Sequence, residues 1–196
     1  MIEIKMFMIR AGRLYFCVME LNNLGPDGAY RTRLLELPDM KAVQSLFDEA
    51  SDYFEKATGM KPGPDEAKRA FVAGPPNKQV SDKRIIGVFD DQDALIGILD
   101  GLVDFPKDGE WTMGMLLLIP EARGRGIGGA VLDAYEQWAS ENGCKRFHTA
   151  LMADMEQSAK FLENRGYRIA RTVENYNAGG RTTNIQFFTK AAGGKR

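Results

Sequence analysis

Residues 116–129 read LLLIPEARGRGIGG, an apolar strand that runs through a glycine-rich turn into a helix. Glycine lets the backbone come close to a bound anion, and the N–H groups of such a turn can point toward it. The positive end of the helix dipole faces the same place. The stretch therefore predicts an anion site that could hold a diphosphate without help from a lysine.

Two other interpretations of this turn compete with a diphosphate site. Gly124, Gly126 and Gly129 satisfy the G-x-G-x-x-G fingerprint of dinucleotide-binding folds. That fingerprint begins where the strand ends and expects an acidic residue about 20 positions later. Here residues 120–123 intervene, and residues 145–147 are Lys-Arg-Phe. A purely structural turn would explain neither the two arginines nor the density of glycines.

The chain after the turn is typical of a parallel crossover followed by a hairpin. Apolar residues recur at helical spacing over 128–142, and a strand follows at 145–152. Strand, helix and strand in that order predict a parallel pair. We further expect a helix at 155–165 and a final hairpin formed by 167–175 and 181–189.

The chain before the turn predicts an antiparallel meander, because its three strands are joined by short connections. Asp39 is expected to cap a single helix that continues to Gly59. The remaining predicted elements are strands at 84–89, 94–103 and 111–119, a strand at 30–37, a helix at 65–72, a hairpin of 2–9 and 14–20, and a loop at 22–28.

Together these elements predict one α/β domain with a central, mostly antiparallel mixed sheet and helices on both faces. We expect that domain to span residues 30–190. Residues 1–29 are interpreted as an N-terminal extension, formed by the hairpin and the loop, and residues 191–196 as a disordered tail. A chain of 196 residues, 44% of them hydrophobic, is long enough for one sizeable core.

The composition excludes several classes of partner. Lys and Arg number 26 and Asp and Glu 27, so the chain lacks the basic excess that nucleic-acid binding requires. Two cysteines, Cys17 and Cys144, lack metal-ligand spacing and indicate neither a metal site nor a disulfide framework. Charged residues interrupt the apolar start, so we expect no signal peptide, no membrane contact and a cytoplasmic protein.

At the glycine turn the sequence resembles a known family. Residues 123–128 are similar to the [Gln/Arg]-x-x-Gly-x-[Gly/Ala] signature of the GNAT superfamily of N-acetyltransferases. Residues 116–120 resemble the family's fourth strand, which ends in proline, and residues 161–167 resemble the end of the helix after its fifth strand. By element order the resemblance extends over residues 30–189.

The resemblance implies that the co-substrate is acetyl-coenzyme A, with its diphosphate on backbone N–H groups and its pantetheine arm along the end of the fourth strand. The acceptor would be a primary amine on a small molecule or a peptide, and the family allows a homodimer. The implied cofactor-binding residues are Leu116, Leu117, Leu118, Arg123, Gly124, Arg125, Gly126, Ile127, Gly128 and Gly129.

The catalytic half of the family pattern is not fully present. The usual general-acid tyrosine falls on Leu162, and a frequent asparagine falls on Met155. Glu110 is the nearest carboxylate to the position of the family's base, and we predict it as the base or as a residue that positions water. Asp104 is the second candidate, with Asp100 beside it, and both could orient a cationic substrate.

Three aromatic residues, Tyr53, Phe54 and Trp111, could form the wall of the substrate pocket, although such residues are more often core. The sole histidine, His148, lies within a predicted strand and is interpreted as structural. The sequence thus favours transfer of an acetyl group from acetyl-coenzyme A to an amine. The alternative is a non-catalytic acyl-coenzyme A-binding domain used for sensing or assembly.

Overall fold

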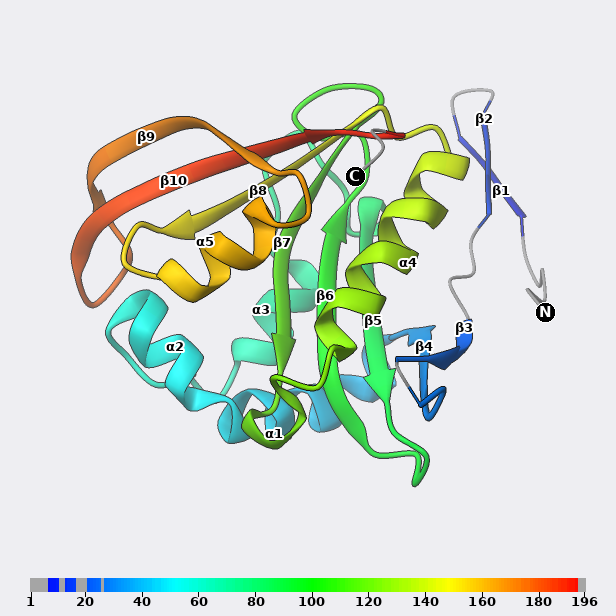
Figure 1. The fold of residues 1–196 in the computed structure, drawn as a ribbon, viewed down its shortest axis with the longest axis horizontal. Helices are drawn as coiled ribbons and strands as arrows, with labels where there is room; N and C mark the ends of the chain where they lie inside the picture. The colour runs from blue at the N-terminus through cyan, green and yellow to red at the C-terminus, as the bar shows by residue number, and fades with distance from the viewer. Residues whose placement is uncertain (1–6, 11–12, 17–20, 26, 194–196) are drawn as a thin grey trace.

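The computed structural model describes residues 7–10, 13–16, 21–25 and 27–193. Its main feature is a mixed, mostly antiparallel sheet with helices on both faces, which confirms the predicted fold class (Figure 1). Its eight strands are, in spatial order, β3 (Leu21–Leu24), β4 (Tyr30–Leu34), β5 (Lys83–Phe89), β6 (Leu95–Leu102), β7 (Glu110–Leu118), β8 (Arg146–Met152), β10 (Thr182–Ala191) and β9 (Arg168–Asn177).

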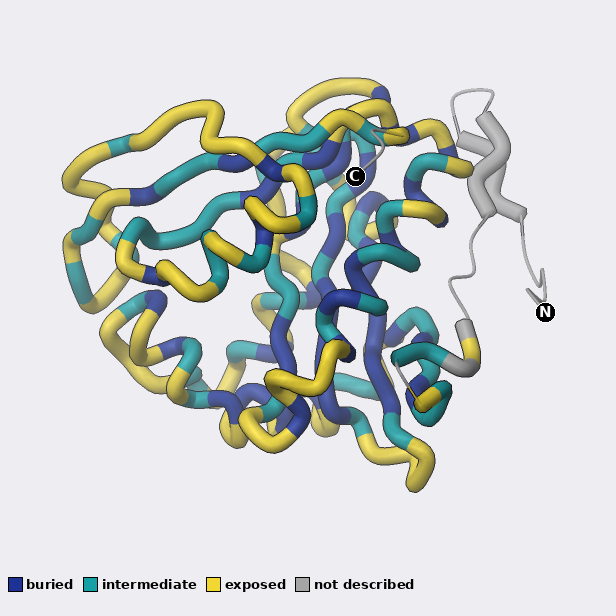
Figure 2. Tube along the Cα trace, in the orientation of Figure 1, coloured by how far each residue is buried: buried dark blue, intermediate teal, exposed yellow. Residues whose placement is uncertain are grey.

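Helices cover both faces of this sheet, and a core cluster lies on each face. One core cluster lies between the sheet and α4 and α5 and contains Tyr135, Leu162 and Phe188. The second lies between the sheet and the N-terminal helices and contains Phe47 and Phe54. In Figure 2 the buried segments follow the central strands between these layers. The helices are α1 (Met40–Glu49), α2 (Ser51–Thr58), α3 (Glu66–Val72), α4 (Ile127–Glu141) and α5 (Glu156–Glu163), with 3-10 turns at η1 (Leu37–Asp39), η2 (Val80–Asp82) and η3 (Pro120–Ala122).

The predicted helix from Asp39 to Gly59 is two helices, because the chain bends at Ala50. Phe47 and Phe54 pack edge to face with their ring centroids 5.1 Å apart. Seven residues of straight α-helix would separate the two positions by about 10 Å along the axis. The bend at the fully buried Ala50 therefore brings both rings into one cluster.

β7 and β8 form the parallel pair at the centre of the sheet, and they pair over only part of their length. The register runs from Glu110 opposite Arg146 to Met113 opposite Thr149. Beyond that point β7 stays paired with β6, while β8 continues along β10. The two strands therefore diverge, and the second half of β7 has one open edge, which is seen on the left of β7 in Figure 1.

A β-bulge at Gly114 coincides with the divergence. Gly101 pairs with Met113 and Asp100 pairs with Met115, so Gly114 is the extra residue in β7. A bulge reverses the alternation of side chains along a strand. Trp111 and Met113 thus join the core on the α4 face, whereas beyond the bulge the even-numbered Leu116 and Leu118 do so.

The first part of the chain differs from the prediction. The predicted hairpin is present in the described residues as β1 (Phe7–Arg10) paired antiparallel with β2 (Arg13–Phe16), and its other residues, 2–6 and 17–20, lie outside them. The predicted loop at 22–28 begins as a strand, because β3 pairs with β4 and joins the main sheet.

The end of the chain also differs from the prediction. β10 continues to Ala191, whose partner in β8 is Arg146, and the N–H of Ala192 donates to the Lys145 carbonyl at 2.9 Å. These contacts fix the start of the segment interpreted as a disordered tail, and residues 194–196 lie outside the described part. The domain limits remain a prediction.

No helix among the described residues is long and apolar enough to cross a membrane.

Candidate active site

The turn between β7 and α4 has the geometry of an anion site. Gly124 and Gly126 have φ of 73° and 80°, a left-handed conformation that other residues adopt only at a cost. Within the described residues, the N–H groups of residues 124–128 donate no backbone hydrogen bond, and those of Gly129 and Ala130 both point to the Gly126 carbonyl. Five successive amides are therefore available at the positive end of the α4 dipole.

Arg123 links the turn to α2 through hydrogen bonds and an ion pair. Its Nε donates to the Leu118 carbonyl at 2.9 Å, and its terminal nitrogens bind both carboxylate oxygens of Asp52. The hydrogen bond from Arg123 holds the pKa of Asp52 below its usual value. Arg123 was predicted as a cofactor-binding residue, and the structure gives it a positioning contact that the sequence did not indicate.

Gly129 has a different role from the glycines before it. An added Cβ would lie 1.8 Å from Nη2 of Arg165, so only glycine admits this guanidinium beside the first turn of α4. Arg165 comes from the end of α5, and its Cζ also lies 4.2 Å from the Phe161 ring centroid. Nothing in the sequence pointed to Arg165 except the adjacent glycines at 128–129.

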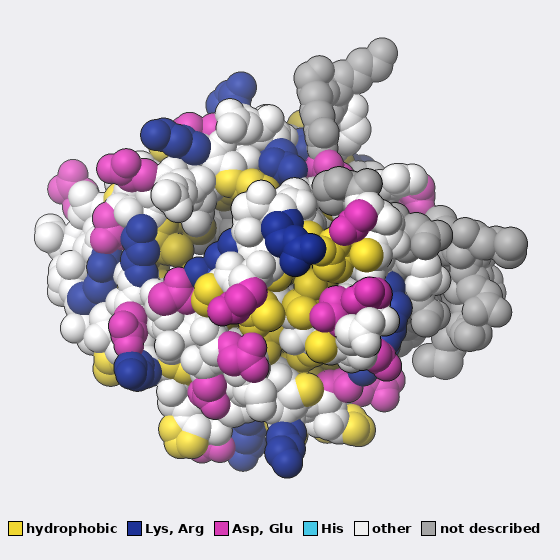
Figure 3. Space-filling view, turned by 60° about the horizontal axis from the view of Figure 1, so that its bottom comes forward, with side chains coloured by type: hydrophobic (Ala, Val, Ile, Leu, Met, Phe, Trp, Pro, Cys, Tyr) yellow, Lys and Arg dark blue, Asp and Glu magenta, His cyan; other side chains and the backbone are white. Residues whose placement is uncertain are grey.

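The open edge of β7 offers backbone groups to a ligand. The N–H of Ile119 donates to Ile96 in β6, so the N–H and C=O of Leu118 and Leu116 point the other way, toward the divergence. The Leu118 carbonyl is taken by Arg123, but the other groups face no strand in the described sheet. Figure 3 shows this end of the molecule, where apolar side chains gather among charged ones.

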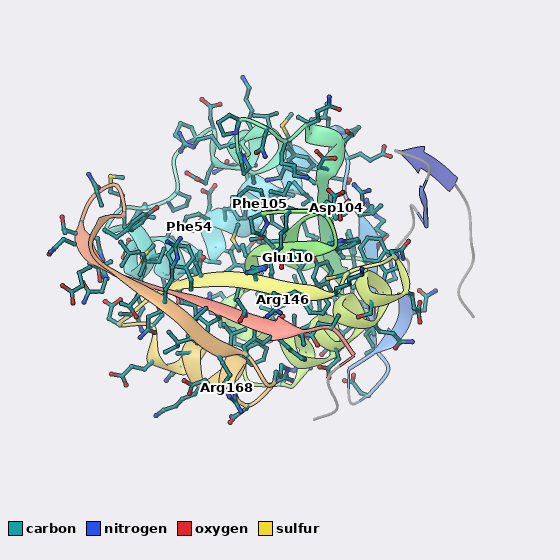
Figure 4. All side chains as sticks on the ribbon, turned by 90° about the horizontal axis from the view of Figure 1, so that it is seen from above. Phe54, Asp104, Phe105, Glu110, Arg146 and Arg168 are labelled. Atoms are coloured by element: carbon teal, nitrogen blue, oxygen red, sulfur yellow. The ribbon has the colours of Figure 1, made fainter. Side chains whose placement is uncertain are left out.

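Glu110 begins β7 and lies in a cluster of cationic side chains. Its Oε2 is 2.9 Å from Nε2 of His148, and its Oε1 is 3.5 Å from both Nε of Arg146 and Nζ of Lys107. The Glu110 side chain is only 12% exposed. Figure 4 shows Glu110 between Arg146 and the loop that carries Phe105 and Asp104.

Asp104 and Asp100 occupy different environments. Asp104 accepts a hydrogen bond from the Gly109 N–H at 2.7 Å and so shapes the β6–β7 loop. Asp100 faces the bulge, since its Oδ2 would lie 3.5 Å from a Cβ added at Gly114. Lys83 Nζ is 3.0 Å from the same oxygen, yet burial outweighs this ion pair and raises the pKa of Asp100.

The three predicted pocket aromatics are not brought together. Tyr53 and Phe54 lie on α2, on the Glu110 side of the sheet, and burial raises the pKa of Tyr53. Trp111 is 1% exposed on the opposite face, where it packs against Trp138 at 5.4 Å between ring centroids. Trp111 is thus a core residue. Buried and partly exposed side chains alternate at the start of β7, so Trp111 and Glu110 point to opposite faces of the sheet.

Leu162 and Met155, where the resemblance led us to expect a tyrosine and an asparagine, are both buried. Leu162 belongs to the core beneath α4 and α5. Its carbonyl also accepts the N–H groups of Arg165 and Tyr167 at the end of α5. In this structure the residue at the tyrosine position is therefore part of the packing between helices.

Comparison with known proteins identifies the fold and its family. Residues 43–167 match the model of the acetyltransferase (GNAT) family, which is more than half of the chain. No curated protein matches the chain in sequence. Many solved structures match it in fold.

Three of these structures illustrate the likeness, and each is less than 20% identical to this chain. Spermidine N-acetyltransferase from Vibrio cholerae, in complex with CoA and spermine, is 15% identical with a TM-score of 0.67 over 84% of this chain and 96% of its own. A GCN5-related N-acetyltransferase from Kribbella flavida is 19% identical, with a TM-score of 0.64 over 83% and 98%. The ribosomal-protein-S18-alanine N-acetyltransferase from Escherichia coli is 13% identical, with a TM-score of 0.64 over 85% and 96%.

Proposed function

Since the chain belongs to the acetyltransferase (GNAT) family and is an N-acetyltransferase, we propose that its β7–α4 turn binds the diphosphate of acetyl-coenzyme A. The observation that carries this proposal is the row of five amides, residues 124–128, without a backbone partner among the described residues. Gly124 and Gly126 adopt the left-handed conformation and add no Cβ atom to this row. The family uses acyl-coenzyme A, which supplies an activated acyl group and a thiol leaving group.

The pantetheine arm would lie along the open edge of β7. The outward N–H and C=O of Leu116 and the N–H of Leu118 can form hydrogen bonds with its amides, as a neighbouring strand would. The N–H of Leu118 could also donate to the oxygen that gains charge during acyl transfer. Arg165, beside Gly129, adds a positive charge near the turn.

The acceptor is proposed to be a primary amine that approaches from the face carrying Glu110, Asp100 and α2. The opposite face is filled by α4 and its aromatic cluster. The similar structures include enzymes named for spermidine and for a protein's alanine, so both small and peptide amines belong in a screen. Glu110 is proposed to act in the removal of the amine's proton.

The cofactor assignment is tested by Gly126→Asp with Gly126→Ala as its matched control. Both variants place a Cβ on a left-handed backbone, at a cost of about 1–2 kcal/mol. Only aspartate adds a negative charge where the diphosphate would approach the amides. We expect calorimetry to show acetyl-coenzyme A binding in the wild type and in Gly126→Ala, weakened at most tenfold in the latter, and none in folded Gly126→Asp.

Equal affinity of the two variants would remove the diphosphate from this turn. Turnover is then measured with a panel of polyamines, amino acids and peptides, by detection of the thiol that coenzyme A release exposes. A protein that binds acetyl-coenzyme A must release the thiol with at least one primary amine for the acceptor proposal to stand.

A further inference from the structure

The sole histidine and Glu110 form a hydrogen-bonded pair across neighbouring strands. The distance between His148 Nε2 and Glu110 Oε2 is 2.9 Å, and the two side chains are 23% and 12% exposed. An ionised carboxylate only accepts hydrogen bonds, so Nε2 carries the hydrogen in a neutral imidazole. The lone pair is then on Nδ1, which has no hydrogen-bond partner in the described part of the chain.

The position of His148 places this imidazole beside the divergence of β7 and β8. His148 is opposite Thr112, one pair before the last pair of the parallel ladder, Met113 with Thr149. Because one residue of strand spans about 3.3 Å, His148 lies about that distance along β8 from the last pair of the ladder. The flanking Phe147 and Thr149 are buried, and Phe147 belongs to the core on the α4 face. Because side chains alternate along β8, His148 faces the other side of the sheet, from which the acceptor is proposed to approach.

The rest of the cluster holds Glu110 in place. Arg146 Nε and Lys107 Nζ, from β8 and from the β6–β7 loop, both lie 3.5 Å from the oxygen that His148 does not use. One carboxylate oxygen is thus directed to the two cations and the other to the imidazole. Such a carboxylate fixes both the tautomer and the orientation of a histidine that receives a proton.

We propose that His148 accepts the proton that the acceptor amine loses, and that Glu110 is a positioning residue for His148. This inference rests on the proposed function. In the step, Nδ1 of His148 takes one proton from the acceptor ammonium, directly or through one water. The neutral nitrogen then forms a bond to the acetyl carbon, the carbon–sulfur bond breaks, and its electron pair leaves with the sulfur. The second proton that the nitrogen loses goes to the departing thiolate or to water.

Asp100 is the rival for this role, because its carboxylate lies beside Gly114 at the bulge. Its Oδ2, however, is paired with Lys83, which also donates to the Ala73 carbonyl at 3.1 Å. The two candidates predict different results. If Asp100 were the base, Asp100→Asn would cause the loss of turnover that we expect from His148→Gln.

The experiment compares His148→Gln, Glu110→Gln and Asp100→Asn with two acceptors. One acceptor is an alkylamine, which is protonated at assay pH, and the other is an O-alkyl hydroxylamine, which is already neutral. For His148→Gln we expect kcat with the alkylamine to fall roughly 10²-fold and kcat with the hydroxylamine to fall less than about threefold. Glu110→Gln should show the same preference with a loss of roughly tenfold, and Asp100→Asn should show no such preference.

Acetyl-coenzyme A affinity is measured on every variant, so that a failure of cofactor binding is separated from a failure of proton transfer. Equal losses with both amines in His148→Gln would show a structural role and overturn the proposal. A loss confined to Asp100→Asn would also overturn it. Wild-type protein that does not bind acetyl-coenzyme A would instead refute the proposed function.

A second readout does not depend on any variant folding. His148 is the only histidine, so its ring protons give an assigned NMR signal in protein made without a histidine tag. Addition of coenzyme A with a saturating alkylamine is expected to shift that signal. A signal that stays unchanged while the amine binds would place His148 away from the acceptor and reject the proposal.

Discussion

The thiol of Cys144 shows how a single residue's chemistry depends on its place in the fold. Cys144 follows α4 and is 4% exposed, and its Sγ lies 3.3 Å from the Arg146 carbonyl. Burial disfavours the thiolate and raises the pKa of Cys144 to about 12. A cysteine with so little thiolate at neutral pH is chemically inert while the protein is folded.

This predicts slow thiol labelling in the native state. In a Cys17→Ser protein, which retains one cysteine, the thiolate fraction at pH 8 should be on the order of 10⁻⁴, compared with about 0.2 for an ordinary thiol. We expect an aromatic disulfide reagent to react about 10³-fold more slowly with folded protein than with protein unfolded in urea. The native rate should rise as the pH increases, because the thiolate fraction rises with it. Similar native and unfolded rates at pH 8 would show that Cys144 is accessible.

At the scale of one element, the first turn of α4 contains two adjacent glycines in different surroundings. A Cβ at Gly128 would meet only Leu118, at 3.7 Å, which is an ordinary contact. A Cβ at Gly129 would collide with Arg165, whose Nε also lies 3.8 Å from Asp133 in α4. The same helix thus contains one glycine whose Cβ position is open and one whose Cβ position is occupied by the end of the Arg165 side chain.

These surroundings predict opposite effects for two alanine substitutions. Gly128→Ala should raise the free energy of unfolding by about 0.5 kcal/mol, because alanine favours the helix. Gly129→Ala should lower it by less than about 1 kcal/mol, since the guanidinium at the flexible end of Arg165 has to turn away and loses its contact with the Phe161 ring. Urea denaturation of both variants measures the difference. In Arg165→Ala protein the penalty of Gly129→Ala should largely disappear, and a penalty that persists there would show that another contact requires glycine.

At the scale of the whole molecule, the β9–β10 hairpin closes onto α2, far from it in sequence. The N–H of Gly180 donates to the Thr58 carbonyl at 2.8 Å. Nη2 of Arg181 also lies 2.7 Å from Oδ2 of Asp154, in the connection between β8 and α5. A Cβ at Gly180 would lie 2.9 Å from the Thr58 oxygen and 2.7 Å from Met60 Cγ. The hairpin and α2 can therefore approach this closely only because residue 180 is glycine.

Gly180→Ala is predicted to separate the hairpin from α2. We expect hydrogen exchange at the amide of residue 180 to be faster and the free energy of unfolding to fall by about 1–3 kcal/mol. Addition of Met60→Ala to the Gly180→Ala protein should restore little of the lost stability, because the carbonyl oxygen of Thr58 would still lie too close to the new Cβ. Gly74→Ala is the control, since a Cβ there meets nothing within 4 Å. Unchanged exchange at residue 180 would mean that the two segments separate freely in the wild type.

The sequence by itself determined most of the elements and the glycine turn between β7 and α4. Periodicity, apolar runs and turn residues located the strands and helices from β4 to β10, because these signals are local in the sequence. The glycines at 124 and 126 predicted a left-handed turn before α4, because that conformation is local and nearly specific to glycine. The family resemblance rested on the same local residues. Local signals also misled, since the helical spacing from Asp39 to Gly59 did not reveal the bend at Ala50.

Only the tertiary structure decided which side chains meet. The bulge at Gly114 shifts the faces of β7, and the register of β7 with β8 sets Glu110 beside His148, 38 residues later. Arg165 reaches Gly129, 36 residues earlier, and Arg123 reaches Asp52, 71 residues earlier. Such contacts depend on strand register and on the packing of elements, which no run of neighbouring residues specifies. For that reason the sequence located the glycine turn proposed to bind the cofactor, which is one continuous segment, but not the partners of the catalytic candidates.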